Sequence, residues 1–374
     1  MAKDKPKISL LLTGGGARAA YQVGVLKAIA KWYPRVHHSP FSIYCGTSAG
    51  AINAISIACY ASCFHLGVKK LESTWSQLHS RKVFSASPYG MTSYLAKQWF
   101  ARLQAGYHER PPFGLLNSRP LRQLLNQVNN YERLEKQILA GNLHGISVTA
   151  SSYKSGVSVS FFQGQNELTE WDRAKSKGRR ALITTEHLLA SSAIPLIFPA
   201  TRIGQTYYGD GSIHQLAPLR PSLKMGADKI LIIDLINQKV SERDHTKAPG
   251  LATLGGHLMD TIFSDTMTAD LEHLSRTNTL IQALPEHEKQ RLQLKNVDYI
   301  HLSPSQSFGP LAQKYYCHMP PMPRALMRLA GISPRDDAAI TSYILFEPDY
   351  IHALIDMGYQ DALEQETLLR NFLK

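Results

Sequence analysis

Cysteine is scarce in this chain of 374 residues, which contains only Cys45, Cys59, Cys63 and Cys317. Four cysteines are too few for a disulfide framework, and buried free thiols in a reducing compartment are the simpler interpretation. The spacing of Cys59 and Cys63 could place both on one helix face, but no second Cys or His pair completes a zinc-binding pattern. We therefore expect neither a metal ion nor an organic cofactor.

A long, purely apolar run is also missing. The N-terminal stretch has only a short apolar core before three glycines, which favours a first strand over a secretory signal. The most apolar segment, residues 51–68, is about long enough to span a bilayer, but it contains Asn53, Ser56 and His65. We expect a buried helix there and a cytoplasmic protein, with peripheral membrane association left open.

Acidic residues are outnumbered, at 29 against 41 lysines and arginines, and the formal net charge is +12. Such a surplus favours anionic partners. No nucleic-acid-binding motif accompanies the charge, so we expect no nucleic-acid partner. The densest basic run, RAKSKGRR at residues 173–180, is interpreted as a solvated loop, and a patch facing an anionic phospholipid surface is the alternative.

Signals of nucleotide binding are incomplete. Gly14, Gly16 and Ala19 fit the glycine spacing of a dinucleotide fingerprint. That fingerprint also needs an acidic residue about 20 positions further on, at the end of the second strand, and none stands there. A phosphate-binding P-loop would need a G-K-[ST] sequence, which the glycine turn does not have. Both gaps argue against nucleotide binding.

Two strand–turn–helix units open the chain. Residues 7–13 (KISLLLT) are typical of a buried strand, three glycines follow, and apolar residues then recur at helical spacing from residue 17 to about 32. Residues 41–45 predict a second strand, and a second helix begins at residue 49. The repeated order favours an α/β fold with a mainly parallel sheet.

The later segments continue this alternation. From residue 69 to 140 the pattern is helical and more polar, with breaks at 85–90 (SASPYG) and 109–114 (ERPPFG), and it predicts a helical insertion or cap. Residues 246–250 (TKAPG) mark a joint, after which the chain is mostly helical. The remaining predictions are strands at 145–150, 157–162, 229–235 and near 300, a helix at 185–193 and a hairpin at 201–211.

One serine stands where a strand is predicted to turn into a helix. Residues 46–50 (GTSAG) fit G-x-S-x-G in the strand–helix context that a nucleophile elbow requires. The flanking glycines remove the Cβ atoms that would clash in such a strained turn. A serine that merely caps the following helix is the structural alternative for Ser48.

The first glycine turn supplies what a serine nucleophile needs. Gly14, Gly15 and Gly16 offer unobstructed backbone N–H groups at the start of a helix, where they can stabilise a developing oxyanion. Parallel strands would bring this turn and the Ser48 turn to the same edge of the sheet. The two turns together predict a site for nucleophilic acyl chemistry.

Four blocks resemble, in order, those of the patatin-like phospholipase family: GGGARAAYQVGVLKAI, GTSAGAINA, SSAIPLIFPA and GDGSIHQLAPLRPSLKMGADKILIIDL. The tail, SYILFEPDYIHALIDMGYQDAL, is similar to the C-terminal part of bacterial members. The resemblance implies an α/β, patatin-like three-layer sandwich. It predicts a catalytic domain at 7–240, which includes the helical insertion at 69–140, and a mostly helical C-terminal extension at 241–374 packed on it.

The resemblance also implies roles for single residues. Ser48 would be the nucleophile and Asp210 the general base, in a Ser–Asp dyad without a histidine. Gly14, Gly15 and Gly16 would form the oxyanion hole. No metal or cofactor would be needed.

Several positions leave alternatives open. Arg18, beside the oxyanion hole, could contact a substrate head group, or it could anchor the glycine loop, which we favour. Pro195 and Pro199 could shape the wall of an acyl channel or simply pack their loop. Either His187 or His214 could reach the site and turn the dyad into a triad.

Two residues depart from the family pattern. Ala19 replaces a glycine inside a helix, where alanine is tolerated. Ser212 replaces the small third residue of the D-G-[GA] motif, and its hydroxyl could hydrogen-bond Asp210 and alter its basicity. Neither departure touches the proposed nucleophile or base, so we expect activity.

The predicted function is a serine acyl hydrolase that cleaves fatty-acyl esters of phospholipids or lysophospholipids through an acyl-enzyme. The alternatives are a carboxylesterase or thioesterase acting on soluble acyl esters, and a catalytically silent lipid-binding protein. We expect a lipid substrate and peripheral contact with an anionic membrane surface. The sequence leaves acyl-chain length, head group and oligomeric state open.

Overall fold

The computed structural model describes residues 5–33, 38–84, 93–94, 96–97, 99–100, 112–237, 251–292, 294–329 and 338–374. The break predicted at 85–90, half of the break at 109–114 and the joint at 246–250 lie outside these residues. The predicted boundary between residues 240 and 241 lies outside them too.

A single mixed sheet forms the centre, with strand order β10-β9-β1-β2-β3-β4-β6-β5 and a β7–β8 hairpin attached to β3. The five strands from β10 to β3 run parallel to one another, and antiparallel pairing begins between β3 and β4. This confirms the mainly parallel α/β class. The strands are β1 (Ile8–Leu12), β2 (Ile43–Thr47), β3 (Gly145–Ser152), β4 (Val157–Gly164), β5 (Trp171–Arg173), β6 (Ser176–Arg180), β7 (Thr201–Ile203), β8 (Thr206–Asp210), β9 (Lys229–Ile233) and β10 (Asp298–Leu302).

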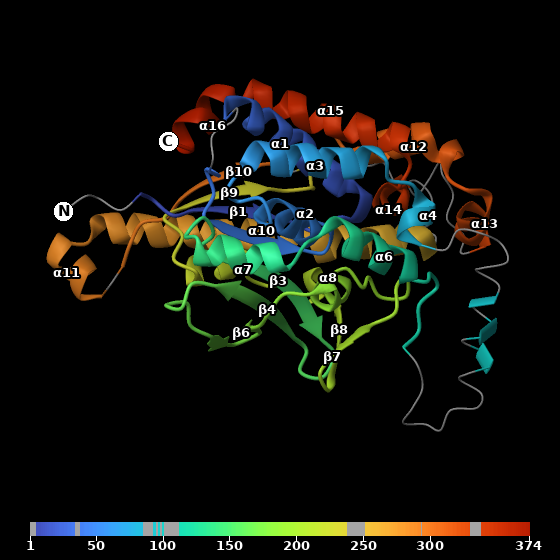
Figure 1. The fold of residues 1–374 in the computed structure, drawn as a ribbon, viewed down its shortest axis with the longest axis horizontal. Helices are drawn as coiled ribbons and strands as arrows, with labels where there is room; N and C mark the ends of the chain where they lie inside the picture. The colour runs from blue at the N-terminus through green and yellow to red at the C-terminus, as the bar shows by residue number, and fades with distance from the viewer. Residues whose placement is uncertain are drawn as a thin grey trace.

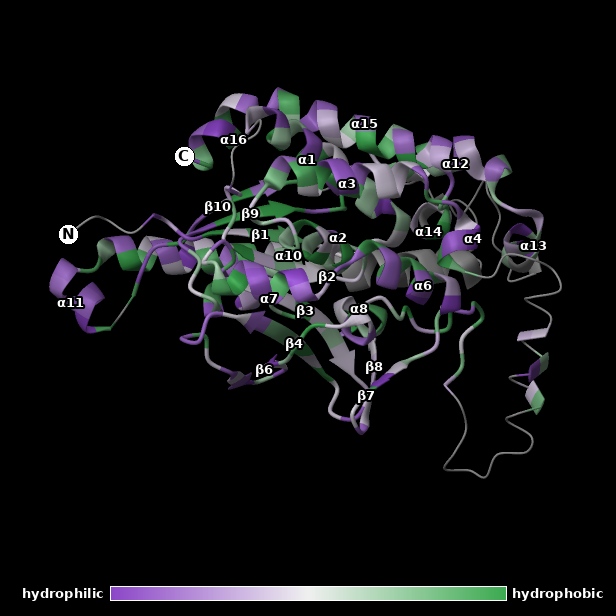
Figure 2. Cartoon of the chain, in the orientation of Figure 1, coloured by the Kyte–Doolittle hydropathy of each residue, from purple (hydrophilic) through white to green (hydrophobic). Residues whose placement is uncertain are grey.

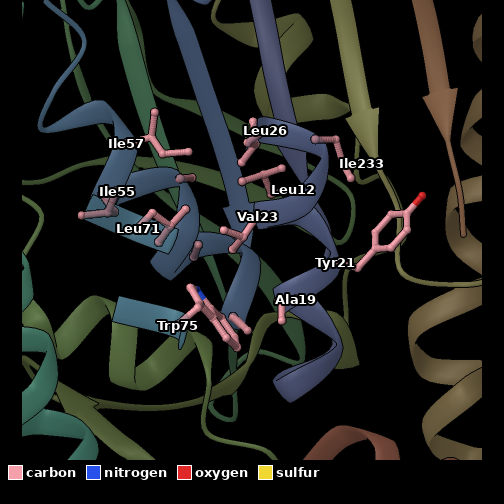
Figure 3. Close-up of a cluster of buried hydrophobic side chains, with 14 of the residues drawn as sticks. Leu12, Ala19, Tyr21, Val23, Leu26, Ile55, Ile57, Leu71, Trp75 and Ile233 are labelled. Atoms are coloured by element: carbon pink, nitrogen blue, oxygen red, sulfur yellow. The ribbon is translucent and has the colours of Figure 1, made fainter. Parts of the chain in front are cut away.

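Helices cover both faces of the parallel part of the sheet (Figure 1). On β1, Leu10 and Leu12 pack into one buried cluster with α1 (Ala20–Trp32), α2 (Ala49–Ala58), α3 (Phe64–Ser76) and α15 (Pro348–Glu364). Leu11, between them, packs into a second cluster with α10 (Leu251–Ala283) and with Leu219 and Met225, which flank α9 (Arg220–Lys224). Successive strand residues point to opposite faces, so this alternation gives three layers. Figure 2 shows the apolar strands β1 and β9 between them, and Figure 3 shows part of the first cluster.

The remaining helices lie around these layers (Figure 1). Three short 3-10 turns stand at Gly16–Ala19, Gly211–Ile213 and Tyr316–His318. The further helices are α4 (Ser80–Val83), α6 (Arg119–Val128), α7 (Glu132–Leu139), α8 (Thr185–Ser191), α11 (Glu286–Arg291), α12 (Phe308–Tyr315), α13 (Pro321–Leu329), α14 (Ala338–Ile344) and α16 (Glu366–Phe372).

The C-terminal part is mostly helical, as predicted, and it is integrated into the main body. Its strand β10, the one expected near residue 300, joins the sheet beside β9. Its helix α15 packs against α1 so closely that a Cβ on Gly24 would stand 1.9 Å from the Ile355 carbonyl oxygen. A Cβ on Gly358 would likewise meet the Tyr21 carbonyl oxygen at 2.1 Å. Glycine at both positions therefore permits backbone contact between the two helices.

The apolar segment at 51–68 is not one helix, as we expected, but parts of two. Helix α2 ends at Ala58, and the Cys63 N–H donates to the Tyr60 carbonyl at 2.7 Å in the turn before α3. Gly67 lets α3 fold back on this turn, because a Cβ there would already lie 3.0 Å from the Tyr60 Cβ. Cys59 and Cys63 therefore do not share a helix face. None of the helices that the structure describes combines the length and the hydropathy needed to cross a membrane.

Contrary to our expectation, the basic run at 173–180 is not a loop, because it supplies the end of β5 and all of β6, although Arg173, Lys175 and Arg180 are exposed to solvent. Lys177 lies 3.3 Å and Arg179 3.1 Å from the Asp172 carboxylate across this hairpin, and their hydrogen bonds hold the pKa of Asp172 below its usual range. Arg180 donates to backbone carbonyls, including those of residues 164 and 168. Much of the positive charge thus meets acceptors within the fold.

Candidate active site

Ser48 occupies the turn between β2 and α2 in a strained conformation. Its φ is 54° and its ψ is −129°, a region that L-residues rarely adopt. A Cβ on Gly46 would lie 2.5 Å from Ala51 Cα, and one on Gly50 would lie 2.3 Å from the Leu12 carbonyl oxygen. The two glycines are therefore required by close backbone approach. Ser48 makes no side-chain capping hydrogen bond to α2, which argues against a purely capping role.

A second serine supports the strained turn. The Ser48 N–H donates to Ser191 Oγ at 2.8 Å, and Ser191 Oγ donates to the Thr149 carbonyl oxygen at 2.6 Å. Ser191 is fully buried at the end of α8. We did not single out this residue in the sequence, because only the fold brings it to a main-chain group 143 positions away.

Asp210 ends β8 and lies beside Ser48. Its N–H donates to the Ala193 carbonyl oxygen at 2.9 Å, and its Oδ1 accepts the Ser212 N–H at 3.0 Å. The side chain is 1% exposed. Burial raises the pKa of Asp210 to about 6, while interactions with the Ser48 side chain and with the backbone and hydroxyl of Ser212 lower it. Ser212, which departs from the family pattern, thus lowers the pKa of Asp210.

One carboxylate oxygen of Asp210 lacks a well-aligned donor. Within the described residues, Oδ2 is enclosed and has no hydrogen bond of ordinary geometry. The Ser48 hydroxyl is nevertheless near enough to lower the pKa of Asp210. We infer that the hydroxyl and the carboxylate are close but poorly aligned for a hydrogen bond. Hydrogen bonds between catalytic groups are often long before substrate binds.

The glycine turn follows β1, the strand beside β2. Gly16 has a φ of +56°, which favours glycine, and lines the same cleft as Ser48. Gln22 Nε2 donates to the Thr13 carbonyl oxygen at 2.9 Å, and Thr13 Oγ1 donates to Asp234 Oδ1 at 3.0 Å. The chain entering the turn is therefore held from two sides. Both turns stand at the same sheet edge, as predicted.

An apolar cleft opens at Ser48. It has about 770 Å³ of empty volume, a figure that includes space open to solvent. Helices α2, α3 and α6 supply most of its walls, and α4, the loop after α8, and α14 with the segment after it supply further parts. The walls include Ile52, Leu71, Trp75, Leu125 and Phe346.

The proline-flanked loop contributes to this cleft through its apolar residues. Ile194 and Phe198 line the cleft, whereas Pro195 and Pro199 are not among the lining residues. Leu196, between them, has a φ of 66° and is 70% exposed. The loop thus shapes the wall through two residues that each stand immediately before a proline.

Arg18 has the contacts of an anchor. It is 6% exposed, its Nε donates to Ser342 Oγ at 2.7 Å, and its guanidinium lies 3.7 Å from the centre of the Tyr343 ring. Arg18 is not among the residues that line the cleft. This geometry supports the anchoring role over the head-group contact.

His187 has a side-chain partner elsewhere, whereas Nδ1 of His214 is enclosed and has no hydrogen bond within the described residues. His187 Nδ1 accepts the Thr184 N–H at 3.1 Å in the capping box of α8, and burial lowers its pKa to about 4. His214 follows the turn after Asp210, and burial and the charge of Lys175 lower its pKa. Neither histidine lines the cleft at Ser48. Among the described residues, no three His, Cys, Asp or Glu side chains gather closely enough to hold a metal ion.

A family model of patatin-like phospholipases matches residues 10–223, which is more than half of the chain. The chain therefore belongs to the patatin-like phospholipase family, as its four sequence blocks indicated. No significant match is found among curated proteins.

Solved structures show more distant likeness. VipD from Legionella pneumophila is 13% identical, with 94% of this chain and 67% of that chain covered and a TM-score of 0.36. Human GIVD cytosolic phospholipase A2, in complex with methyl gamma-linolenyl fluorophosphonate, is 12% identical, with 98% and 58% covered and a TM-score of 0.47. The chain thus spans less than two thirds of the human chain's length. Both TM-scores lie below 0.5, so the family assignment rests on the sequence match.

Proposed function

We propose that the protein is a serine hydrolase of fatty-acyl esters in phospholipids or lysophospholipids, acting through a Ser48–Asp210 dyad. The observation that carries the proposal is the proximity of a strained, buried serine and a buried carboxylate whose pKa is raised to about 6. Such a carboxylate is a stronger base than an ordinary aspartate and is still mostly ionised at neutral pH.

The reaction needs only groups of this chain and water. Ser48 Oγ attacks the ester carbonyl carbon while its proton passes to Asp210. The N–H groups of Gly14, Gly15 and Gly16 hold the tetrahedral oxyanion. The C–O bond to the alcohol then breaks, and the alcohol leaves with the proton from Asp210. Water attacks the acyl-enzyme, gives a proton to Asp210 and releases the fatty acid, after which Ser48 regains its proton.

The cleft supports a lipid acyl chain as the group bound. Its walls are mainly apolar side chains and it begins at Ser48, so a hydrocarbon chain would leave water as the ester reaches the nucleophile. The family membership supports the same substrate class. A cytoplasmic protein that meets its substrate at an anionic membrane surface fits the net charge of +12.

Kinetics on one ester in two physical states test the substrate class. We expect turnover of a lysophospholipid to rise sharply above its critical micelle concentration. Ordinary saturation on short monomeric esters, with no such rise, would instead identify a soluble-ester or thioester hydrolase. Lipid binding with no turnover of any ester would identify a catalytically silent protein.

A further inference from the structure

The segment from Thr341 to Glu347 lies beyond the residues that match the family model but reaches the active site. It runs from the end of α14 to the residue before α15. Thr341, Ser342 and Leu345 are all 1% exposed or less. The burial of the last turn of α14 and of the connection after it points to a packing partner, and that partner is the glycine turn.

Both main chain and side chains of the 341–347 segment touch the glycine turn. A Cβ on Gly16 would stand 2.2 Å from the Tyr343 carbonyl oxygen, so the two backbones are in contact. The Arg18 guanidinium lies over the Tyr343 ring and donates to Ser342 Oγ. Arg18 is two residues after Gly16, and the segment therefore holds the turn at its helical end.

The same segment closes one side of the cleft. Tyr343, Ile344 and Phe346 line it together with Gly16 and Ser48.

Phe346 is held between aromatic neighbours on the wall of the cleft. Its ring stacks near Trp75, with centroids 6.5 Å apart, and meets Phe84 edge-on at 6.5 Å. Glu347 Oε1 accepts the hydroxyl of Ser80 at 2.7 Å, which ties this wall to the start of α4.

Helix α15 fixes the segment from behind. Close contact at Gly24 and Gly358 seats α15 on α1, and Tyr21 Oη donates to Asp361 Oδ2 at 2.9 Å. Since α1 itself begins just after the glycine turn, the turn and the segment are parts of one packed unit.

We propose that the 341–347 segment is a working part of the active site, with Ser342 as a positioning residue for the glycine turn and Phe346 as a determinant of acyl-chain length. The inference rests on the proposed function, because it assigns roles in the same reaction. It assigns them to a part of the chain outside the matched family domain.

Steady-state kinetics on p-nitrophenyl esters of short, medium and long acyl chains test both roles. Ser342→Ala removes one acceptor of Arg18 and should lower kcat about ten-fold with little change in KM, since a small misplacement of transition-state groups costs rate rather than binding. Arg18→Lys tests the same contact from the other side. The two effects should be less than additive, because both variants break one interaction.

Phe346→Ala opens the wall and should shift the ratio of kcat/KM for long against short chains about ten-fold toward long chains. If that variant does not fold, Phe346→Leu should give a smaller shift in the same direction. Ser222→Ala and Phe162→Leu are matched controls. Both residues are fully buried, and Phe162 stacks on Trp171 at 5.3 Å, but neither lines the cleft. Both controls should keep the wild-type kcat and chain-length profile.

Wild-type kcat in folded Ser342→Ala and Arg18→Lys would overturn the positioning role. An unchanged chain-length profile in folded Phe346 variants would overturn the selectivity role. Failure of the proposed function looks different, because Ser48→Ala would then hydrolyse the same esters as fast as the wild type.

Discussion

Replacing Asp210 with asparagine should abolish most activity and make the protein more stable at alkaline pH. The pKa of this carboxyl group rises from 3.8 to about 6 on burial, a shift of about two units, or about 3 kcal/mol. A raised carboxyl pKa favours the protonated folded form. The stabilisation of the folded state by protonated Asp210 is complete below pH 3.8 and is lost as pH rises through about 6.

Asparagine is neutral at every pH and can still accept the Ser212 N–H through its Oδ1. Its amide NH2 group would face the Ser48 hydroxyl and would need an acceptor there. This need offsets about 1 kcal/mol of the stability gained by removing the buried charge. We therefore expect the free energy of unfolding of Asp210→Asn to exceed that of the wild type by about 1–3 kcal/mol at pH 8, and by much less at pH 4. Activity should fall about 100- to 10,000-fold, as for the loss of a general base.

Urea unfolding at pH 4 and pH 8, together with ester hydrolysis from pH 5 to 8, measures these effects. The wild type should also show an ascending limb in kcat/KM with a midpoint near pH 6. Asp270→Asn is the matched control. Burial raises the pKa of Asp270 as well, but its carboxylate accepts the Leu219 N–H at 2.9 Å and does not line the cleft, so activity should persist. Near-normal activity in Asp210→Asn would refute the dyad, and His214 would be the next base to test.

Three further predictions concern the glycine turn, helix α15 and the surface charge. Gly16→Ala should reduce activity at least about 100-fold and cost at least about 1–2 kcal/mol in urea unfolding, because a Cβ at φ +56° would also meet the Tyr343 carbonyl oxygen at 2.2 Å; wild-type turnover would contradict it. Gly358→Ala should cost about 1–3 kcal/mol by the same assay, since it forces α15 away from α1; unchanged stability would show that the helices can separate freely. The net charge of +12 should give tighter binding to anionic than to neutral vesicles at low salt in co-sedimentation, a difference that high salt removes; equal binding at low salt would count against an anionic surface.

The sequence alone predicted the two glycine turns and their common edge. Strand period, glycine position and helical spacing are local signals, and residues 7–32 and those from 41 onward through the second helix carry all of them. The structure confirms parallel pairing of β1 with β2 and the strained Ser48 turn. Asp210 gave no comparable local signal, and only the resemblance to a family linked it to Ser48, which lies 162 positions earlier.

Other features depend on contacts that no local pattern records. The basic run at 173–180 looked like a loop because its acceptors, Asp172 and backbone carbonyls, become neighbours only when the hairpin pairs. The apolar run at 51–68 lacks a glycine or proline at the break between α2 and α3, so helical spacing could not locate that turn. Ser191 and Ser342 act on groups 143 and 324 positions away, and a buried serine carries no sign of such a partner.

The central claim is that Ser48 forms the acyl-enzyme and Asp210 takes its proton. Labelling with a long-chain fluorophosphonate, followed by intact-mass analysis and peptide mapping, tests this directly. The account predicts one adduct on Ser48 in the wild type, none in Ser48→Ala and greatly slowed labelling in Asp210→Asn. An unlabelled wild type, an adduct on another residue or equal labelling rates in wild type and Asp210→Asn would contradict it.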